Sequence, residues 1–256
     1  MNSAGDERAG VDEGSRRMNS PHATYPSIEL RESAVRFHDG RVTRILAHRV
    51  FTPASSQMVL LEGFLTDAEC DALIELSSGT LQPARVVSAV TREESFTTAR
   101  IGHVGLLFGA EHDLIERIET RIEALTRWPR SHFQPLQLSY YGIGDGFKLH
   151  HDFFDPAIPA YHGALKRHGQ RLATLIMYLN DCAGSGNTMF PSLDGLFVAP
   201  QKGNALFFSY PGTATDPDRR FVHGSTPVSA GQKWIATTWL CAQPQDRDRR
   251  VPSSPD

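Results

Sequence analysis

Two histidines, one aspartate and one lysine in the C-terminal half are spaced as a metal and anion site would require. His150 and Asp152 are two residues apart, so both side chains would project from one face of a β-strand. The pair alone is a weak signal, because roughly one His-x-Asp pair is expected by chance in this chain. A surface strand with two polar residues is the alternative interpretation.

His223 and Lys233 would complete a metal and anion site together with His150 and Asp152. His223 follows Asp152 by 71 residues, and Lys233 follows His223 by ten. Two histidines and one carboxylate on one face of an octahedral metal leave three positions open, as in non-haem Fe(II) oxygenases. Dioxygen and a bidentate 2-oxo acid would fill these positions, and Lys233 would neutralise the distal carboxylate of 2-oxoglutarate. A lysine is usually a solvated residue, but this one begins the apolar run Trp234-Ile235-Ala236.

The elements that must position these residues are mainly strands. From Leu136 onward, alternating side chains and clustered β-branched and aromatic residues predict strands at Leu136–Tyr141, Phe147–Phe153, Leu172–Asn180, Ala205–Tyr210, Phe221–His223 and Trp234–Cys241. Segments rich in Gly, Pro and Asp separate them. The pattern favours a closed or double-sheet β architecture with helices packed on one side.

Two helices are predicted before the strands. Thr66 and Glu69 have the spacing of a capping box, and this helix should end at Gly79, with a hydrophobic staple and buried stripe formed by Leu65, Cys70, Leu73, Ile74 and Leu76. The second helix should run from about Glu111 to Arg127 and stop before Trp128-Pro129, with its apolar face formed by Leu114, Ile118, Ile122 and Leu125.

Composition narrows the class of protein. The chain has 256 residues, 40% hydrophobic content and a formal net charge of -3. This charge argues against a nucleic-acid or anionic-membrane surface and favours a small or peptidic substrate. Three cysteines fit neither a disulfide framework nor a zinc site. The three cysteines suit a reducing cytosol and the first 21 residues contain no apolar signal-peptide region, so we expect a cytoplasmic protein. Met18 is a second candidate start. Its oligomeric state is left open.

Several stretches together resemble the prolyl 4-hydroxylase type of 2-oxoglutarate and Fe(II) dioxygenase. The matching segments are LQLSYYGIGDGFKLHHDFFD, QRLATLIMYLND, SGNTMFP, APQKGNALFF, DRRFVHGSTPV and GQKWIATTWL, preceded by VLLEGFLTDAECDALIEL. The resemblance covers roughly Val59 to Cys241. It implies a mainly β fold with helices (α+β), a distorted double-stranded β-helix or cupin-like jelly roll braced by N-terminal helices.

The resemblance also implies roles for individual residues. It makes His150, Asp152 and His223 the catalytic iron ligands and Lys233 the partner of the 2-oxoglutarate C5 carboxylate. Three further residues match positions that help line the cosubstrate pocket, namely Tyr141, Thr174 and Tyr178. Candidate substrate contacts are Arg100, Gln137 and Trp239. Barrel core is the alternative for the aromatic residues and Thr174, and a surface salt bridge is the alternative for Arg100.

The implied reaction couples decarboxylation of 2-oxoglutarate to succinate with hydroxylation of an unactivated C–H bond. Dioxygen is the oxidant, and ascorbate would be expected to restore oxidised iron. Asp152 favours hydroxylation, because related halogenases lack this carboxylate. The implied substrate is a prolyl residue or a free cyclic or basic amino acid. A cupin-like metal sensor without turnover and a nucleic-acid demethylase of the same superfamily are the alternatives.

The chain then divides into four regions. We expect a disordered tail at 1–20, a helical and strand support region at 21–130, the dioxygenase core at 131–243 and a second disordered tail at 244–256. Three departures from the family pattern bear on substrate choice. Phe147 stands where many members have Tyr, the SGNT segment replaces a paired-glycine turn, and Tyr140 stands where members often have a basic residue.

Overall fold

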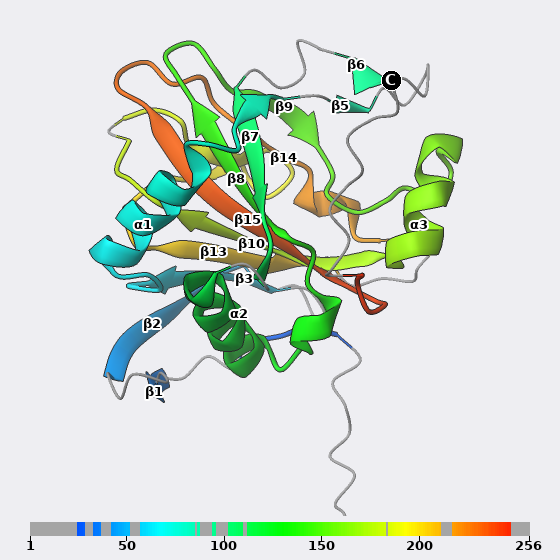
Figure 1. Ribbon diagram of the computed structural model, residues 1–256. Helices are drawn as coiled ribbons and strands as arrows, with labels where there is room; N and C mark the ends of the chain where they lie inside the picture. Colours follow the sequence, from blue (N-terminus) through cyan, green and yellow to red (C-terminus); the bar gives the residue numbers. More distant parts are fainter. Residues whose placement is uncertain are drawn as a thin grey trace, which may run out of the picture.

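The protein is built on two antiparallel sheets that face each other (Figure 1). The computed structural model describes residues 25–28, 33–36, 42–51, 57–84, 86–87, 94–95, 102–109, 112–182, 184–210 and 217–246. None of the helices in these ranges is long and apolar enough to cross a membrane. The predicted mainly β architecture is confirmed.

The larger sheet has nine strands and forms one wall of the molecule. In spatial order it consists of β1 (Ser33–Arg36), β2 (Val42–Phe51), β3 (Gln57–Glu62), β13 (Ala205–Ser209), β10 (Arg171–Tyr178), β15 (Lys233–Cys241), β8 (Leu136–Tyr141), β7 (His103–Leu107) and β4 (Gln82–Pro83). The central strand β10 is buried along almost its whole length. Such a strand must be apolar on both faces, and it is therefore rich in Leu, Ile and Met.

The smaller sheet has four strands, in the order β12 (Leu196–Val198), β11 (Thr188–Phe190), β14 (His223–Ser225) and β9 (Phe147–His150). From β8 to β15 the chain passes back and forth between the two sheets. This winding is the expected jelly-roll or double-stranded β-helix topology. A separate short hairpin pairs β5 (Val86–Val87) with β6 (Glu94–Ser95).

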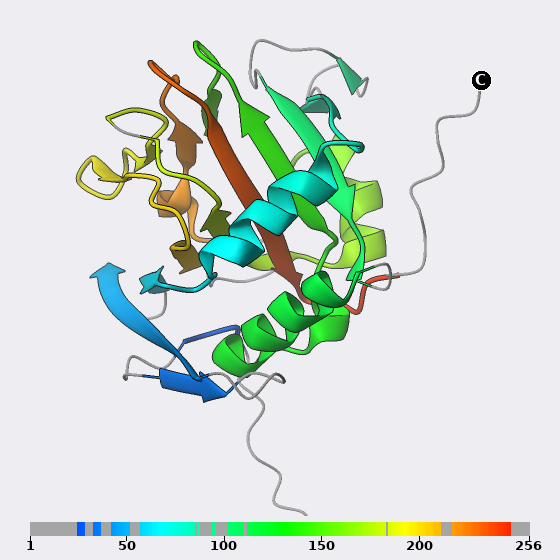
Figure 2. The same cartoon turned by 60° about the vertical axis from the view of Figure 1, so that its left-hand side comes forward.

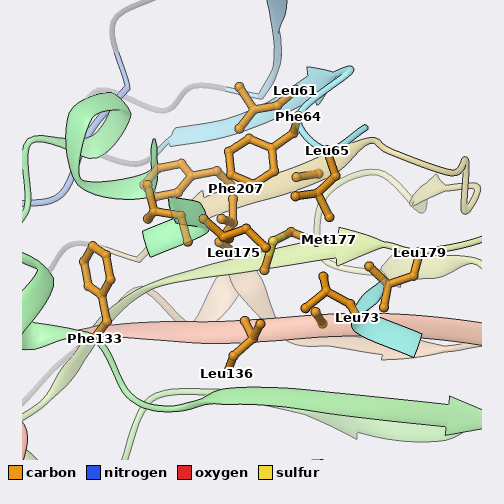
Figure 3. Packing of buried hydrophobic residues seen from close by; sticks show 14 of the residues in the cluster. Leu61, Phe64, Leu65, Leu73, Phe133, Leu136, Leu175, Met177, Leu179 and Phe207 are labelled. Atoms are coloured by element: carbon orange, nitrogen blue, oxygen red, sulfur yellow. The ribbon is translucent and has the colours of Figure 1, made fainter. Parts of the chain in front are cut away.

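The two faces of the larger sheet belong to different cores because side chains alternate along each strand. On β10, Leu175 and Met177 pack in the core under the helices, whereas Ile176 and Tyr178 pack in the core between the sheets. Figure 3 shows the first of these cores, where Leu73 of a helix meets strand residues of the larger sheet. The second core surrounds the cavity described below.

Helix α1 (Asp67–Ser77) begins with the predicted capping box. The hydroxyl of Thr66 accepts from the backbone N–H of Glu69, and the Glu69 carboxylate accepts from the backbone N–H of Thr66. Cys70 and Leu73 are buried as expected, whereas Ile74 and Leu76 are only partly buried. The helix ends one residue before the expected position, because Ser78 rather than Gly79 is the C-cap residue.

Helix α2 (Asp113–Thr126) lies beside α1 on the same face of the larger sheet (Figure 2). Its buried stripe includes Ile115, Ile118 and Ile122, and Leu114 is only partly buried. Arg121 connects the two helices, since its guanidinium donates to the Glu69 carboxylate at 2.7 and 3.1 Å. The same arginine donates to the carbonyl of Phe64. These buried contacts hold the helices against the sheet.

Short helices occupy several connections. The 3-10 turn η2 (Arg130–His132) joins α2 to β8, whereas η3 (Pro159–Tyr161) and α3 (His162–His168) lie between β9 and β10, and η4 (Arg219–Phe221) comes just before β14. At the C-terminal end, Gln245 donates its backbone N–H to the carbonyl of Ser131 and its side chain bonds to His168. Ordered contacts therefore extend to Gln245, a residue of the stretch expected to be a solvated tail.

Candidate metal and cosubstrate site

Three side chains with metal-ligating atoms meet between the two sheets. His150 ends β9 and His223 begins β14, and the two residues are direct partners in the smaller sheet. The Nε2 atom of His150 lies 3.6 Å from Oδ1 of Asp152, and Nε2 of His223 lies 3.5 Å from Oδ2 of Asp152. The three expected ligands are therefore brought together, within the separations that a single metal ion requires.

The placement of Asp152 differs from the expected one. Strand β9 ends at His150, so the predicted strand Phe147–Phe153 is too long and Asp152 lies in a bend. Because no strand pairing reaches this bend, the side chains of Gln170 and Arg171 hold it in place. Gln170 bonds to both backbone groups of Phe154 at 2.8 Å, and Arg171 donates to the carbonyl of Asp152 at 3.0 Å.

Both histidines are fixed with Nε2 toward the site. The Nδ1 atom of His150 lies 2.9 Å from the carbonyl of Lys148, and Nδ1 of His223 lies 3.0 Å from the carbonyl of Phe221. A carbonyl can only accept, so each Nδ1 carries a proton and Nε2 is the atom left to bind a metal ion. An imidazole held in this way by a backbone carbonyl is typical of metal ligands.

Asp152 is kept ionised although it is buried. Burial alone would raise the pKa of this carboxyl, but the neighbouring His223, His150 and Arg171 and a hydrogen bond from Thr174 together lower it to about 2. The hydroxyl of Thr174 donates to Oδ2 at 2.7 Å. The donor set is therefore two imidazole nitrogens and one carboxylate, which suits Fe(II).

Lys233 lies at the start of β15, inside the same cavity. Its side chain is 1% exposed, and Nζ donates to the carbonyl of Gly186 at 2.6 Å and to the hydroxyl of Ser225 at 2.9 Å. Gly186 has φ of +63°, and a Cβ there would come within 3.1 Å of the lysine side chain. A glycine is therefore required where the backbone approaches the lysine. A buried ammonium group of this kind is suited to a carboxylate.

The cavity encloses about 450 Å³, part of which is open to solvent. The metal-ligating residues and Lys233 line it together with Gln137, Tyr141, Phe147, Ile176, Thr188, Gly224, Ser225, Ile235, Thr237 and Trp239. Lys233 and Trp239 lie six residues apart on the same face of β15, about 20 Å along the strand. The cavity is therefore long enough for a cosubstrate and part of a second molecule.

Tyr141 lines the cavity as expected, but two other expected lining residues lie one layer behind it. Thr174 is completely buried under Asp152, and it also bonds to the hydroxyl of Tyr210 at 3.2 Å. Tyr178 is completely buried, and its hydroxyl donates to Thr188 at 2.9 Å. These two residues support groups of the cavity wall and do not form its surface.

Only two of the three candidate substrate contacts lie at the cavity in the described residues. Gln137 and Trp239 line the cavity at the end away from Lys233. Arg100 lies outside the described residues. Tyr140 was expected to bear on substrate choice, but it faces the other side of the sheet, where it packs on Trp234 with ring centroids 4.8 Å apart. The one-residue alternation of β8 carries it away from the cavity.

Phe147 and the SGNT segment do form part of the site. Phe147 stacks on the imidazole of His150 with centroids 3.8 Å apart. The SGNT segment contributes the Gly186 carbonyl to Lys233 and Thr188 to the cavity wall. Both departures from the family pattern therefore lie where they can affect the bound molecules.

Sequence reasoning missed several residues of the site. Ser225, Ile235 and Thr237 could have been found from alternation, because they share a face with His223 or Lys233. Arg171 had no such signal. Its guanidinium stacks on Trp239 with the central carbon 3.9 Å from the ring centroid, and it also bonds to Gln134.

Comparisons with known proteins agree with this geometry. Residues 136–241 match the 2OG-Fe(II) oxygenase superfamily. Probable prolyl 4-hydroxylase 6 of Arabidopsis thaliana is 33% identical over 201 residues, which cover 71% of this chain and 67% of the relative. The chain belongs to the prolyl 4-hydroxylase-like 2OG-Fe(II) oxygenases. Probable prolyl 4-hydroxylase 8 of the same plant is 30% identical over 84% of this chain and 77% of its own length.

A solved structure supports the assignment. The viral collagen prolyl hydroxylase from Paramecium bursaria Chlorella virus-1, in its 2OG complex, matches with a TM-score of 0.55 and 28% identity over 72% of this chain and 94% of the viral chain. This prolyl 4-hydroxylase-like protein is therefore a 2-oxoglutarate-dependent hydroxylase that uses Fe(II). Membership of this enzyme family counts against the alternative of a metal sensor without catalysis.

Proposed function

We propose that this enzyme hydroxylates a prolyl residue within a peptide, in preference to a free cyclic or basic amino acid. The observation that carries the proposal is that the residues lining one end of the cavity, Gln137, Thr237 and Trp239, are uncharged. The nearby guanidinium of Arg171 is already engaged by Trp239, Gln134 and Asp152. Lys233 is the only lysine or arginine among the described residues that line the cavity, and it lies at the opposite end. A free amino acid would bring a carboxylate that this end does not match.

A peptide fits the polar groups that this end does offer. The indole Nε1 of Trp239 is buried and has no hydrogen-bond partner among the described residues. A buried N–H group without a partner costs free energy, which a substrate carbonyl would recover if binding turned the indole toward it. The relatives and the viral structure are named as prolyl hydroxylases, and this supports proline as the residue that is modified.

The proposed division of roles follows the geometry. His150, Asp152 and His223 would hold Fe(II), which with dioxygen and 2-oxoglutarate supplies the oxidising power to hydroxylate a C–H bond while succinate and carbon dioxide form. Lys233 would bind the C5 carboxylate of 2-oxoglutarate, with Ser225 orienting its ammonium group. Phe147 and Ile235 line the wall between the two ends and would exclude water.

The proposal also includes a reductant and a cellular compartment. Ascorbate would restore iron oxidised in turnovers that do not reach substrate. The enzyme would act in the cytoplasm or another reducing compartment. All three cysteines are free and buried, which supports a protein that does not depend on disulfides.

The test is a substrate panel that compares proline-containing peptides with free amino acids. The enzyme is incubated with Fe(II), 2-oxoglutarate and ascorbate, and with either proline-containing peptides or free proline, lysine and arginine. We expect peptides to stimulate succinate formation and to gain one oxygen atom by mass spectrometry. Stimulation by free amino acids alone would reject the peptide assignment. If no candidate stimulates succinate formation and Asp152→Ala leaves basal turnover unchanged, the hydroxylase assignment itself fails.

A further inference from the structure

Asp152 is the one metal-ligating residue that no sheet ladder holds, so other groups must determine where its carboxylate points. The main chain places His150 and His223 opposite each other in the smaller sheet. Asp152 lies beyond the end of β9. Its carboxylate is restrained by a chain of buried hydroxyl groups from the larger sheet, formed by Thr174 of β10 and Tyr210 just after β13.

The direction of this chain follows from its donors. Thr174 has a single O–H, and it is donated to Oδ2 of Asp152 at 2.7 Å. The contact of 3.2 Å between Thr174 and Tyr210 must then be donated by the tyrosine hydroxyl. Thr174 is completely buried and Tyr210 is 1% exposed, so water does not compete. Each hydrogen bond polarises the next in such a chain.

We propose that Tyr210 and Thr174 are positioning residues that occupy Oδ2 of Asp152 and leave Oδ1 to bind the metal. The proposal rests on the hydroxylase function proposed above. A carboxylate that bound through both oxygens would take one of the three positions needed by the 2-oxo acid and dioxygen. Oδ2 lies 3.5 Å from Nε2 of His223 and so could also reach the ion. The hydrogen bond from Thr174 is what limits the carboxylate to one metal-bound oxygen and keeps those positions available. Thr174 thus acts behind the cavity wall and does not contact the cosubstrate.

The packing shows why both residues are needed. The backbone of Tyr210 is fixed by two hydrogen bonds. Its N–H donates to the carbonyl of Leu172 at 3.2 Å, and its carbonyl accepts from the hydroxyl of Tyr25 at 3.0 Å. Its ring packs against Phe153, the residue after Asp152, with centroids 5.9 Å apart. Tyr210 therefore touches both the hydroxyl that holds Asp152 and the bend that carries it.

The test measures metal binding without turnover. Calorimetry with Mn(II), in the absence of dioxygen, gives the affinity of each variant, and the absorption spectrum of the Co(II) form reports the coordination number. We expect Thr174→Val to weaken Mn(II) binding about 10- to 100-fold and to change the Co(II) spectrum. Thr174→Ser keeps the hydroxyl and should restore both. Tyr210→Phe should weaken binding about two- to ten-fold.

A double variant separates positioning from general packing. Because Tyr210 acts through Thr174, Tyr210→Phe should weaken Mn(II) binding no further in the Thr174→Val background. Thr126→Val is the matched control, since it removes another buried threonine hydroxyl that bonds at 2.8 Å, on helix α2. It should lower thermal stability and leave Mn(II) affinity unchanged.

Three results would overturn the inference. They are unchanged Mn(II) affinity and Co(II) spectrum in Thr174→Val, an additive effect in the double variant, and an equal loss of affinity in Thr126→Val. Failure of the proposed function looks different, because it would appear in the substrate panel as a lack of stimulation by peptides, while the Mn(II) affinities of these variants would still follow the expected order.

Discussion

The guanidinium of Arg171 lies over the indole of Trp239, with its central carbon 3.9 Å from the ring centroid. The same side chain donates to the backbone carbonyl of Asp152 at 3.0 Å and to the amide oxygen of Gln134 at 3.0 Å. One residue thus connects the bend that carries a metal-ligating carboxylate to the aromatic wall of the substrate end. Only a planar group with several N–H donors can make all these contacts at once.

Replacing Arg171 by lysine should therefore reduce activity although the charge is kept. A lysine cannot stack and donate in two directions, so we expect Arg171→Lys to lower kcat/KM for the peptide substrate about 10- to 100-fold. Arg130→Lys is the control, because Arg130 forms a partly exposed ion pair with Glu116 at 3.0 Å, and such pairs contribute little. Equal activity of the two variants would show that the stacking has no catalytic importance.

Lys233→Ala should weaken 2-oxoglutarate binding while metal binding is retained. The variant removes the charge that faces the carboxylate, so calorimetry with the Mn(II) form should show a loss of about 10- to 100-fold in 2-oxoglutarate affinity. Ser225→Ala should cause a smaller loss, because only one bond to the ammonium group disappears. Lys202→Ala, which removes a surface pair with Asp71, should have no effect. A proportional loss of Mn(II) affinity in Lys233→Ala would instead indicate misfolding.

The metal-free protein should lose stability in acid because of Asp152. Although burial by itself would raise its pKa, the neighbouring charges lower the pKa of the folded carboxyl from 3.8 to about 2. A depressed pKa stabilises the fold at pH above 3.8, and this contribution, about 2 kcal/mol, is lost as the pH falls toward 2. Urea unfolding of the metal-free enzyme and of Asp152→Asn should show a steeper acid loss in the unmodified protein. Parallel curves would contradict this assignment.

Glu69→Ala should destabilise the protein more than Thr66→Ala. Loss of the Thr66 hydroxyl removes one helix cap, which costs about 1 kcal/mol. Glu69 also pairs with the buried guanidinium of Arg121 at 2.7 Å, and removing the partner of a buried charge costs about 3–5 kcal/mol. Urea denaturation measures both. If the two variants lose equal stability, the ion pair contributes nothing beyond the cap.

Phe147 and Tyr140 should differ in their effect on catalysis. Phe147→Leu removes the ring that stacks on His150, and we expect about a ten-fold fall in kcat/KM because a supporting contact of a metal-ligating group is lost. Tyr140→Phe lies on the opposite face of the sheet and should leave kcat/KM unchanged while stability varies by less than about 1 kcal/mol. A kinetic effect of Tyr140→Phe would show that the two faces are coupled.

Local patterns were sufficient to predict much of the fold. Strand β8 has the predicted bounds, β15 begins one residue early at Lys233, and the capping box of α1 is present. Alternation and capping depend on neighbours in the sequence, so they can be read from it. The strand at Phe147 was predicted too long because apolar residues continue to Phe154, where they pack in a bend instead of a ladder.

The supporting groups of the site could not be predicted in the same way. Thr174 is one of several small polar residues in apolar strands, and only the fold shows that its hydroxyl meets Asp152. Tyr210 is 36 residues from Thr174, and no motif joins the two. Arg171 begins a strand, where a charged residue is ordinarily solvated. These contacts depend on how the two sheets face each other, which is a property of the tertiary structure.

The backbone carbonyls of Lys148 and Phe221 hold His150 and His223 two residues further along the chain. Each imidazole is thereby held by a carbonyl of its own chain segment, which is strand β9 for His150 and the 3-10 turn η4 for His223. Metal binding therefore does not have to orient either ring, and the protein itself determines which nitrogen of each histidine faces the ion.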